Sequence, residues 1–266
     1  MRARITVAPT ITKLPEGVAG TVLITGSHGG AYPASLAAKA RVRGLIFHDA
    51  GIGREDAGVA ALGLAIPAVA ISHLSARVGD TADMQARGRV SRANAAAAAL
   101  GVVAGMGCAE AAERLSAAEW IETAAPEVAE GRTVLRPEGA LRPLVLIDSA
   151  AMVDPEADRG AVIVTGSHGG LVGGDPKMAL RADGFAAAYH DAGIGIEAAG
   201  LGRLAPLEAR GIAAITVAAA SARIGDARSI FEDGIISAAN PTALRLGAVV
   251  GAPAREVLLA WTRLAG

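Results

Sequence analysis

Short apolar runs that end in glycine or in polar residues recur along the chain and predict the buried strands of parallel sheets. Such runs cover residues 21–26, 44–49 and 68–72 in the first half, and 161–166, 185–191 and 212–220 in the second. The segments between them predict helices, which we expect at residues 34–43, 55–64 and most of 83–104, with counterparts in the second half. The alternation of strand and helix predicts the α/β class.

Three hexapeptides occur twice in the same order, which indicates an internal duplication. TGSHGG stands at 25–30 and 165–170, HDAGIG at 48–53 and 190–195, and SARVGD at 75–80 with SARIGD at 221–226. We therefore predict two tandem, sequence-related, Rossmann-like βα repeats with parallel sheets, at residues 1–118 and 141–266, joined by a connector at residues 119–140. Because an ancestral single-repeat homodimer would bury the same surface, we expect the repeats to pack with pseudo-twofold symmetry.

Two Ala/Gly-rich segments, residues 94–106 and 240–250, predict helices with small side chains on several faces. Such helices can approach one another closely. We expect them to pack either between the repeats or between protomers of a homo-oligomer.

Composition removes several classes of function. The 266 residues include 25 basic and 26 acidic side chains, so the formal net charge of −1 argues against nucleic acid as a partner. A single cysteine, Cys108, excludes a disulfide framework. The longest uncharged runs are interrupted by polar residues or rich in alanine, and the N-terminus has no apolar signal region, so we expect no membrane partner and a cytoplasmic protein.

All three hexapeptides follow predicted strands, and ligands of open α/β sheets bind at the carboxyl ends of strands. Glycine after a strand is also ordinary turn chemistry. Histidine and aspartate, however, are retained beside these glycines in both repeats, while the intervening helices have diverged. The hexapeptides are therefore the candidate site.

The TGSHGG motif predicts an acid–base group next to an anion site. We expect His28 and its counterpart His168 to be catalytic, with a structural, hydrogen-bonded histidine as the alternative. Backbone amides near the start of a helix can hold a developing oxyanion. The substrate-binding residues predicted from this motif are Ser27, Gly29, Gly30, Ser167, Gly169 and Gly170.

The HDAGIG motif places two ionisable residues at a strand end. Side chains alternate along a strand, so one of the two faces the site, and we expect this to be Asp49, with Asp191 in the second repeat. Asp49 would act as a base or orient His28. The alternative is that Asp49 stabilises the glycine-rich turn, and that His48 is a core histidine.

The SARVGD motif supplies an arginine suited to bidentate recognition of a substrate carboxylate. Its predicted substrate-binding residues are Ser75, Arg77, Asp80, Ser221, Arg223 and Asp226. The alternative is a structural ion pair of Arg77 with Asp80 or Asp49. His73 has no counterpart, because Ala219 occupies that position in the second repeat.

No cofactor is predicted, with a divalent metal as the alternative. Histidine and carboxylate ligands suit zinc, manganese or iron, and the candidate ligands are His28, His48, Asp49 and Asp80. The chain has no HExxH or other tight ligand spacing, which makes this the weaker hypothesis.

These features predict an enzyme that acts on a small, anionic carboxylate- or carbonyl-bearing metabolite by His/Asp acid–base chemistry. The leading expectation is a hydrolase acting on an amide-like C–N bond. The first alternative is an isomerase or racemase whose acid–base groups come from both repeats, as His28 with His168 or Asp49 with Asp191. The second is a non-catalytic protein that binds a small anion.

Overall fold

Two mixed β-sheets form the centre of the computed structural model, which describes residues 2–265. The first sheet has the strand order β1-β2-β3-β4-β5, with β1 Ile5–Ala8, β2 Val22–His28, β3 Gly44–His48, β4 Ala68–Ile71 and β5 Val90–Ala93. The second has the order β11-β10-β9-β8-β7-β6, with β6 Arg132–Leu135, β7 Leu144–Ile147, β8 Val162–His168, β9 Ala186–His190, β10 Ala213–Val217 and β11 Ile236–Ala239.

Strands β1 to β4 and β7 to β10 run parallel, while β5, β6 and β11 add antiparallel edges. The predicted α/β class with parallel strands is confirmed, and the architecture is consistent with a Rossmann-like fold. Both sheets follow chain order, so neither contains the strand-order reversal at which such folds form their ligand crevice.

Apolar side chains cover both faces of each sheet, which explains why the strands are uninterrupted apolar runs. On the first sheet, α1 (Ala31–Lys39) and η1 (Arg54–Gly63) pack on one face, and α2 (Thr81–Arg87), α3 (Ala95–Ala99) and α4 (Cys108–Leu115) on the other. On the second sheet, α5 (Leu204–Ala209) packs opposite α6 (Ala227–Asp233), α7 (Pro241–Arg245) and α8 (Ala254–Thr262).

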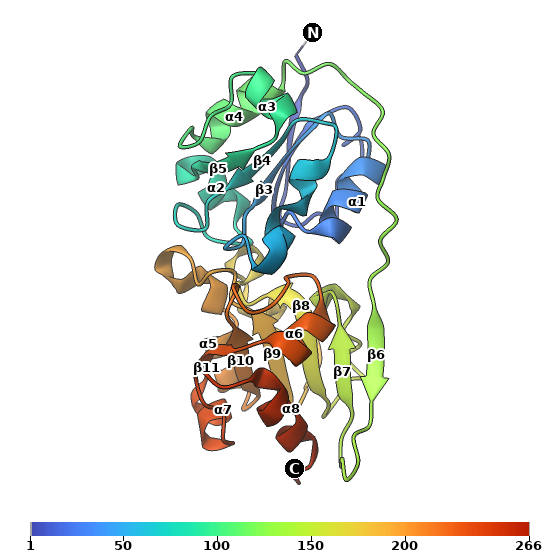
Figure 1. The fold of residues 1–266 in the computed structure, drawn as a ribbon, viewed down its shortest axis with the longest axis vertical. Helices are drawn as coiled ribbons and strands as arrows, with labels where there is room; N and C mark the ends of the chain where they lie inside the picture. The colour runs from blue at the N-terminus through green and yellow to red at the C-terminus, as the bar shows by residue number, and fades with distance from the viewer. Residues whose placement is uncertain (1, 266) are drawn as a thin grey trace.

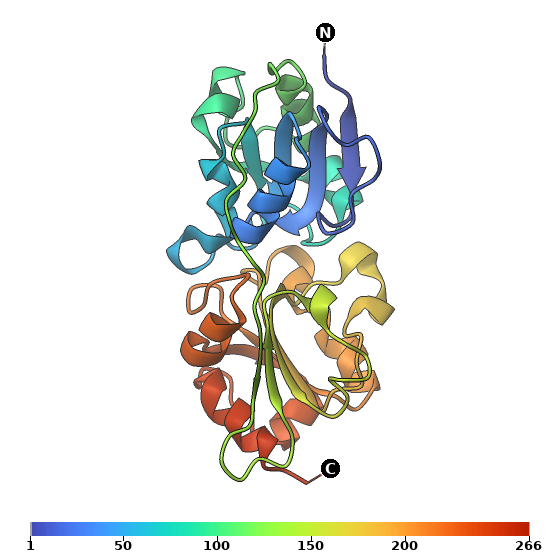
Figure 2. The same ribbon diagram turned by 90° about the vertical axis from the view of Figure 1, so that its right-hand side faces the viewer.

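The two sheets lie one above the other along the long axis, with the two chain ends at opposite ends of the molecule (Figures 1 and 2). The segment between α4 and β6 runs along one side and joins the halves (Figure 2). The carboxyl ends of the central strands point toward each other across the boundary. The loops that follow β3 and β9 are in contact there, since a Cβ on Gly51 would lie 2.6 Å from Cα of Gly193.

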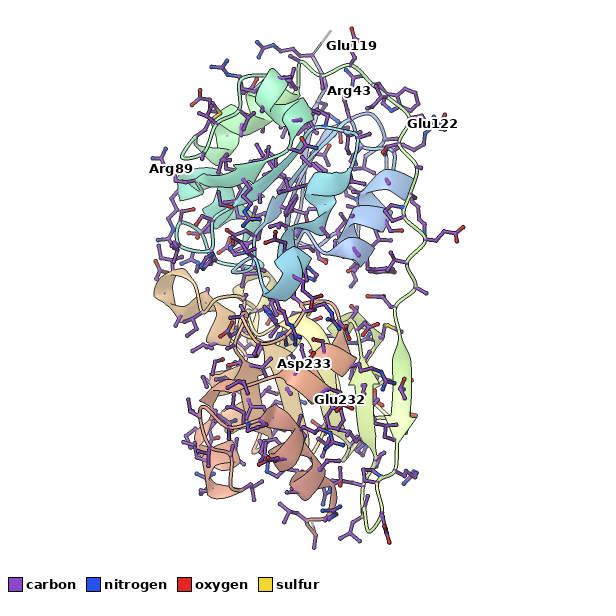
Figure 3. All side chains as sticks on the ribbon, viewed as in Figure 1. Arg43, Arg89, Glu119, Glu122, Glu232 and Asp233 are labelled. Atoms are coloured by element: carbon purple, nitrogen blue, oxygen red, sulfur yellow. The ribbon has the colours of Figure 1, made fainter. Side chains whose placement is uncertain are left out.

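The contacts across this boundary come in reciprocal pairs. The amide of Arg54 donates to the carbonyl of Ala219, and the amide of Ile196 donates to the carbonyl of His73, each at 2.8 Å. Ala50, Val78, Ala192 and Ile224 form a small apolar cluster to which each half contributes two residues. Arg54 also pairs with Asp233, which is labelled at this boundary in Figure 3.

The prediction of one long helix over most of residues 83–104 is wrong. This segment forms α2, β5 and α3 instead, because Gly88 ends α2 in an extended conformation and the following residues pair with β4. Strand pairing thus overrides the helical propensity of the alanines. The second half has no α-helix directly after β8. There, the short 3-10 turns η3 (Val172–Gly174) and η4 (Pro176–Met178) occupy the sequence Gly-Gly-Asp-Pro.

The first alternative for the Ala/Gly-rich helices, packing between the repeats, is also wrong, and packing between protomers stays a prediction. Gly101 and Gly247, with φ of +82° and +89°, limit α3 and α7 to five residues each. These two helices lie at opposite ends of the molecule (Figure 1), so the halves meet through strand-end loops.

The segment predicted as a connector, residues 119–140, contributes the edge strand β6 to the second sheet. Among residues 2–265, no helix is long and apolar enough to cross a membrane.

Candidate active site

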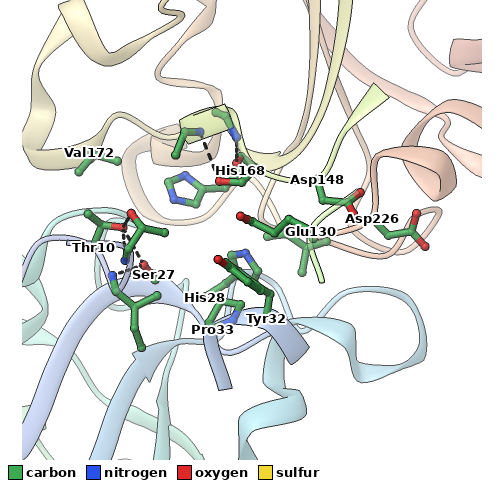
Figure 4. A pocket seen from close by; sticks show the side chains of 18 of the residues that line it. Thr10, Ser27, His28, Tyr32, Pro33, Glu130, Asp148, His168, Val172 and Asp226 are labelled. Carbon is green, nitrogen blue, oxygen red and sulfur yellow. Dashed lines mark hydrogen bonds between the residues drawn. The ribbon is translucent and has the colours of Figure 1, made fainter. Parts of the chain in front are cut away.

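A cavity of about 960 Å³ lies between the two halves, and both central strand ends contribute to it. Ser27 and His28 from β2 lie on one wall, and His168 from β8 lies on the opposite wall (Figure 4). Ser167 of β8 also lines the cavity. The connector and the loop after β7 close one side, where Glu130 and Asp148 lie (Figure 4). The structure therefore brings together the Ser-His pairs of both repeats.

His28 is held with one ring nitrogen turned toward the protein. The amide of Gly30 donates to Nδ1 of His28 at 3.1 Å, so Nδ1 carries no proton and the neutral ring is protonated at Nε2. Burial lowers the pKa of His28 to about 3, helped by the nearby His190 and His48. At neutral pH this imidazole is a neutral hydrogen-bond donor at the cavity wall.

His168 has the same position on the other wall but different surroundings. Its side chain is 93% buried, as only 7% is exposed, and its Nδ1 forms no hydrogen bond. Burial lowers its pKa well below the usual value, and the charge of Arg203 lowers it further. His168 is therefore also neutral at neutral pH, and no amide hydrogen bond assigns its tautomer.

The two serines line the cavity beside the histidines and hold neighbouring loops. Ser27 Oγ accepts the amide of Ile11 at 3.0 Å, and Ser167 Oγ accepts the amide of Ala150 at 2.9 Å. Both hydroxyl groups can still donate to a ligand. Neither forms a hydrogen bond with the neighbouring histidine ring, so the structure supports a binding role and gives no nucleophile–base pair.

Three of the four glycine amides are not available for the expected oxyanion site. Gly29 donates to the carbonyl of Gly58, Gly30 to His28, and Gly169 to the carbonyl of His190. These amide protons are used within the protein. The glycines instead permit close packing, since a Cβ on Gly29 would lie 2.1 Å from the Phe47 ring.

The HDAGIG loops stand outside the cavity and form the contact between the halves. Residues 50–53 all have positive φ, and so do residues 192–195. This backbone is costly for Ala50 and Ile52. His48 offsets part of the cost, because its Nδ1 accepts the amide of Ala50 while its Nε2 donates to the carbonyl of Ala76.

The two carboxylates of the HDAGIG motifs also stabilise these turns. Asp49 accepts the amides of Gly51 and His73 and lies 3.0 Å from Nδ1 of His73. Asp191 accepts the amides of Gly193 and Ala219. Neither contacts His28 or His168, so the prediction that Asp49 orients His28 is wrong. The alternative, stabilisation of the turn, accounts for both carboxylates.

The SARVGD and SARIGD motifs connect the halves by ion pairs. Arg77 pairs with Asp80 at 3.1 Å and, across the boundary, with Glu197 at 2.9 Å. Arg223 pairs in the same way with Asp226 at 3.1 Å and with Glu55 at 3.2 Å.

These ion pairs leave neither arginine free to bind a substrate carboxylate by itself. Asp80 and Asp226 accept amides at the starts of α2 and α6. The hydroxyls of Ser75 and Ser221 bind backbone groups at distances of 2.7 to 2.9 Å. Of the substrate-binding residues predicted from these two motifs, Arg223 and Asp226 line the cavity, and Ser75, Arg77, Asp80 and Ser221 do not.

Among residues 2–265, no three His, Cys, Asp or Glu side chains are grouped as a metal site would require. His48 and Asp49, two of the four candidate ligands, are buried and bound to backbone groups. Cys108 is buried in the first sheet's core, and burial raises its pKa to about 12.

Sequence reasoning missed several polar cavity residues, and four of them, Tyr32, Glu130, Asp148 and Arg203, lie near the two Ser-His pairs. Arg203 is 4% exposed and donates to the carbonyls of His168 and Gly170 at 3.1 Å. None of the four belongs to a repeated motif. A difference between the two halves could have identified Arg203. Its amide donates to the carbonyl of the first glycine after Ser-His in the second half, as the amide of Ala61 does in the first half, so Ala61 is its structural counterpart.

Comparisons with protein-family models, with curated proteins and with solved structures found no match to this chain. The function is therefore argued from the geometry and chemistry of the cavity.

Proposed function

We propose that the cavity is the active site of an isomerase that moves a proton at a carbon next to a carbonyl or carboxylate of a small metabolite. The observation that carries this proposal is the placement of two neutral imidazoles, His28 and His168, on opposite walls of one cavity. Two such groups can reach both sides of a single substrate.

We further propose that the halves arose by tandem duplication and pack with pseudo-twofold symmetry. The repeated hexapeptides and the reciprocal contacts across the boundary support this origin. In an isologous dimer, residue i contacts residue j and residue j contacts residue i. The pairs Arg77–Glu197 and Arg223–Glu55 follow this rule.

His28 acts in this proposal as a hydrogen-bond donor to the substrate oxygen. The amide of Gly30 occupies Nδ1, and a proton on that nitrogen would oppose the amide proton. The Nε2–H group can donate to a carbonyl and stabilise the negative charge that develops on its oxygen. Neutral imidazole suits this role, because its Nε2–H group can donate without any change in the protonation of the ring.

His168 acts as the base. Its unprotonated ring nitrogen takes the proton from carbon, the C–H electron pair forms the C=C bond of an enolate, and the carbonyl π electrons move to oxygen. The imidazolium then returns the proton to the same carbon from another direction or to a neighbouring carbon. Protons and electrons balance without a redox partner.

Hydrolysis of a C–N bond remains a second candidate because of one observation. Burial and the nearby Asp148 raise the pKa of Glu130, whereas hydrogen bonds from Ser149 and Tyr32 lower it. A carboxyl group with a raised pKa can protonate a leaving nitrogen. In that reaction His168 would act as a general base and accept a proton from the attacking water molecule.

Proton exchange in D₂O tests the proposal. The protein is incubated with 2-oxo acids, 2-hydroxy acids, amino acids and lactams, and loss of the proton next to the carbonyl is followed by NMR. We expect exchange in one class and no exchange with His168→Gln. Ring opening of lactams without exchange would favour hydrolysis, and saturable binding with neither reaction would favour a binding protein.

A further inference from the structure

Two carboxylates on one side of the cavity have no cationic partner. Glu130 lies on the connector just before β6, and Asp148 lies just after β7. Figure 4 shows Glu130 between the imidazoles of His28 and His168, and Asp148 on the far side of Glu130, next to Asp226. Among residues 2–265, no ion pair includes Glu130 or Asp148. The structure thus directs two negative charges toward one space.

The basic side chains that line the cavity are engaged elsewhere or remain apart from these carboxylates. Arg223 pairs with Asp226 and Glu55. Arg203 donates to four backbone carbonyls, and Arg181 donates to the carbonyl of Ala151. Lys13 also lines the cavity and forms no ion pair within the described chain.

The carboxylate of Asp148 is fixed in place. Its Oδ2 accepts the amide of Gly131 at 2.6 Å, and its Oδ1 accepts the amide of Ala227 at 2.9 Å. This charge therefore cannot turn away from Glu130, and burial together with Asp148 raises the pKa of Glu130. Like charges held close together destabilise each other, and a bound cation would remove that cost.

A second observation in the same cavity points to a ligand. The His168 ring extends into the cavity (Figure 4), is 7% exposed, and its Nδ1 has no hydrogen-bond partner. Buried polar groups are normally paired. An imidazole that no hydrogen bond holds, beside two carboxylates that have no cationic partner, therefore leaves binding capacity for the polar groups of a bound molecule.

We infer that the substrate carries a protonated nitrogen, an ammonium or guanidinium group, that binds Glu130 and Asp148. Such a group donates several charge-assisted hydrogen bonds to carboxylates. This inference rests on the proposed function only in placing the substrate in this cavity. With the carbonyl that His28 would contact, it defines the substrate class as amino acids and amines that bear a carbonyl group.

Paired probes test the charge requirement without turnover. L-leucinamide carries an ammonium group, and N-acetyl-L-leucinamide replaces it by a neutral amide; agmatine tests a guanidinium group. Binding is measured by isothermal titration calorimetry and by ligand-observed NMR. We expect L-leucinamide or agmatine to bind, and N-acetyl-L-leucinamide to bind at least about tenfold more weakly.

Carboxamide variants test the two carboxylates separately. Glu130→Gln and Asp148→Asn are each expected to weaken binding of the cationic probe about tenfold. Glu138→Gln, at an exposed position in the turn after β6, is the control and should leave binding unchanged. If Asp148→Asn fails to fold, because Asp148 also holds two amides, Glu130→Gln decides the question alone.

The inference is overturned if no cationic probe binds, if the acetylated probe binds equally well, or if Glu130→Gln binds the cation as well as the unaltered protein does. His168→Gln separates this result from the proposed function, because it removes the base and leaves both carboxylates. Cation binding without proton exchange in the unaltered protein would overturn only the isomerase. Exchange without selectivity for cations would overturn only this inference.

Discussion

The two halves contribute the same Ser-His pair to the cavity, but they surround it differently. In the first half α1 begins directly after Gly30, and the Gly30 amide occupies Nδ1 of His28. In the second half the 3-10 turns η3 and η4 replace that helix, and Nδ1 of His168 has no partner. Identical hexapeptides therefore present imidazoles of different chemical character.

One substitution between the halves explains much of this difference. Arg203 occupies the position that Ala61 has in the first half, and its guanidinium group binds the carbonyls of the loop that follows His168. A buried cation also disfavours a second positive charge beside it, which lowers the pKa of His168. The difference shows how two halves that share a sequence motif can place its imidazoles in unequal surroundings.

The largest expected effect comes from substituting the two histidines separately. His168→Gln should lower kcat about 10³- to 10⁴-fold, because glutamine cannot take a proton. His28→Leu should lower it about 10²- to 10³-fold through loss of the donor, whereas His28→Gln, which keeps an N–H donor, should lose about tenfold or less. Steady-state kinetics on the substrate found by proton exchange measures all three.

Equal losses for His28→Gln and His168→Gln would contradict unequal roles and favour the symmetric acid–base pair. Circular dichroism and melting temperatures of the variants provide the folding control. Retention of the full rate in His168→Gln would exclude His168 as the base.

The second prediction concerns stability at acid pH, where both cavity histidines act in the same direction. Their pKa values in the folded state lie below the value of 6.5 of an unfolded chain, and that of His28 is about 3. Unfolding below pH 6.5 therefore takes up protons, so the stability present above pH 6.5 is lost as the pH falls. His28 alone lowers the free energy of unfolding by about 1.4 kcal/mol per pH unit between roughly pH 6 and 4, and His168 acts in the same direction.

Urea titrations across this pH range measure the slope. His28→Gln should reduce it by about 1.4 kcal/mol per pH unit, and His168→Gln should reduce it as well. His48 and His190 are buried with lowered pKa values and add to the slope of every variant. A slope that neither substitution changes would show that the two cavity imidazoles accept protons without unfolding the protein.

The strands were predictable because buried parallel strands are continuous apolar runs, and the runs at residues 21–26 and 161–166 correspond to β2 and β8, which extend two residues further. The edge strand β5 was missed because its sequence, VSRA, lies among alanines and becomes a strand only by pairing with β4. Local propensity cannot report a partner that lies 20 residues away in the chain.

The candidate site was predictable in part for a similar reason. His28 and His168 follow strands, and strand ends are where a site forms. Asp49 and Arg77 follow strands as well, yet they contact the turn and the other half, which no single repeat can specify. Glu130 has no repeat partner, and its position depends on how the connector packs against both halves.

The smallest expected effect concerns the reciprocal ion pairs, in which Arg77 has one carboxylate partner more than Arg223, namely Asp83. The side chains of Arg77 and Arg223 are 41% and 37% exposed, so solvent screens both. Arg77→Gln and Arg223→Gln should each lower the melting temperature by at most about 3 °C, and 1 M salt should remove the difference from the unaltered protein. Glu110→Gln, which breaks the pair with Arg114 inside one half, is the matched control. A much larger loss of melting temperature for only one of the two arginines would mean that the two ion pairs contribute unequally to stability, although their contacts are reciprocal.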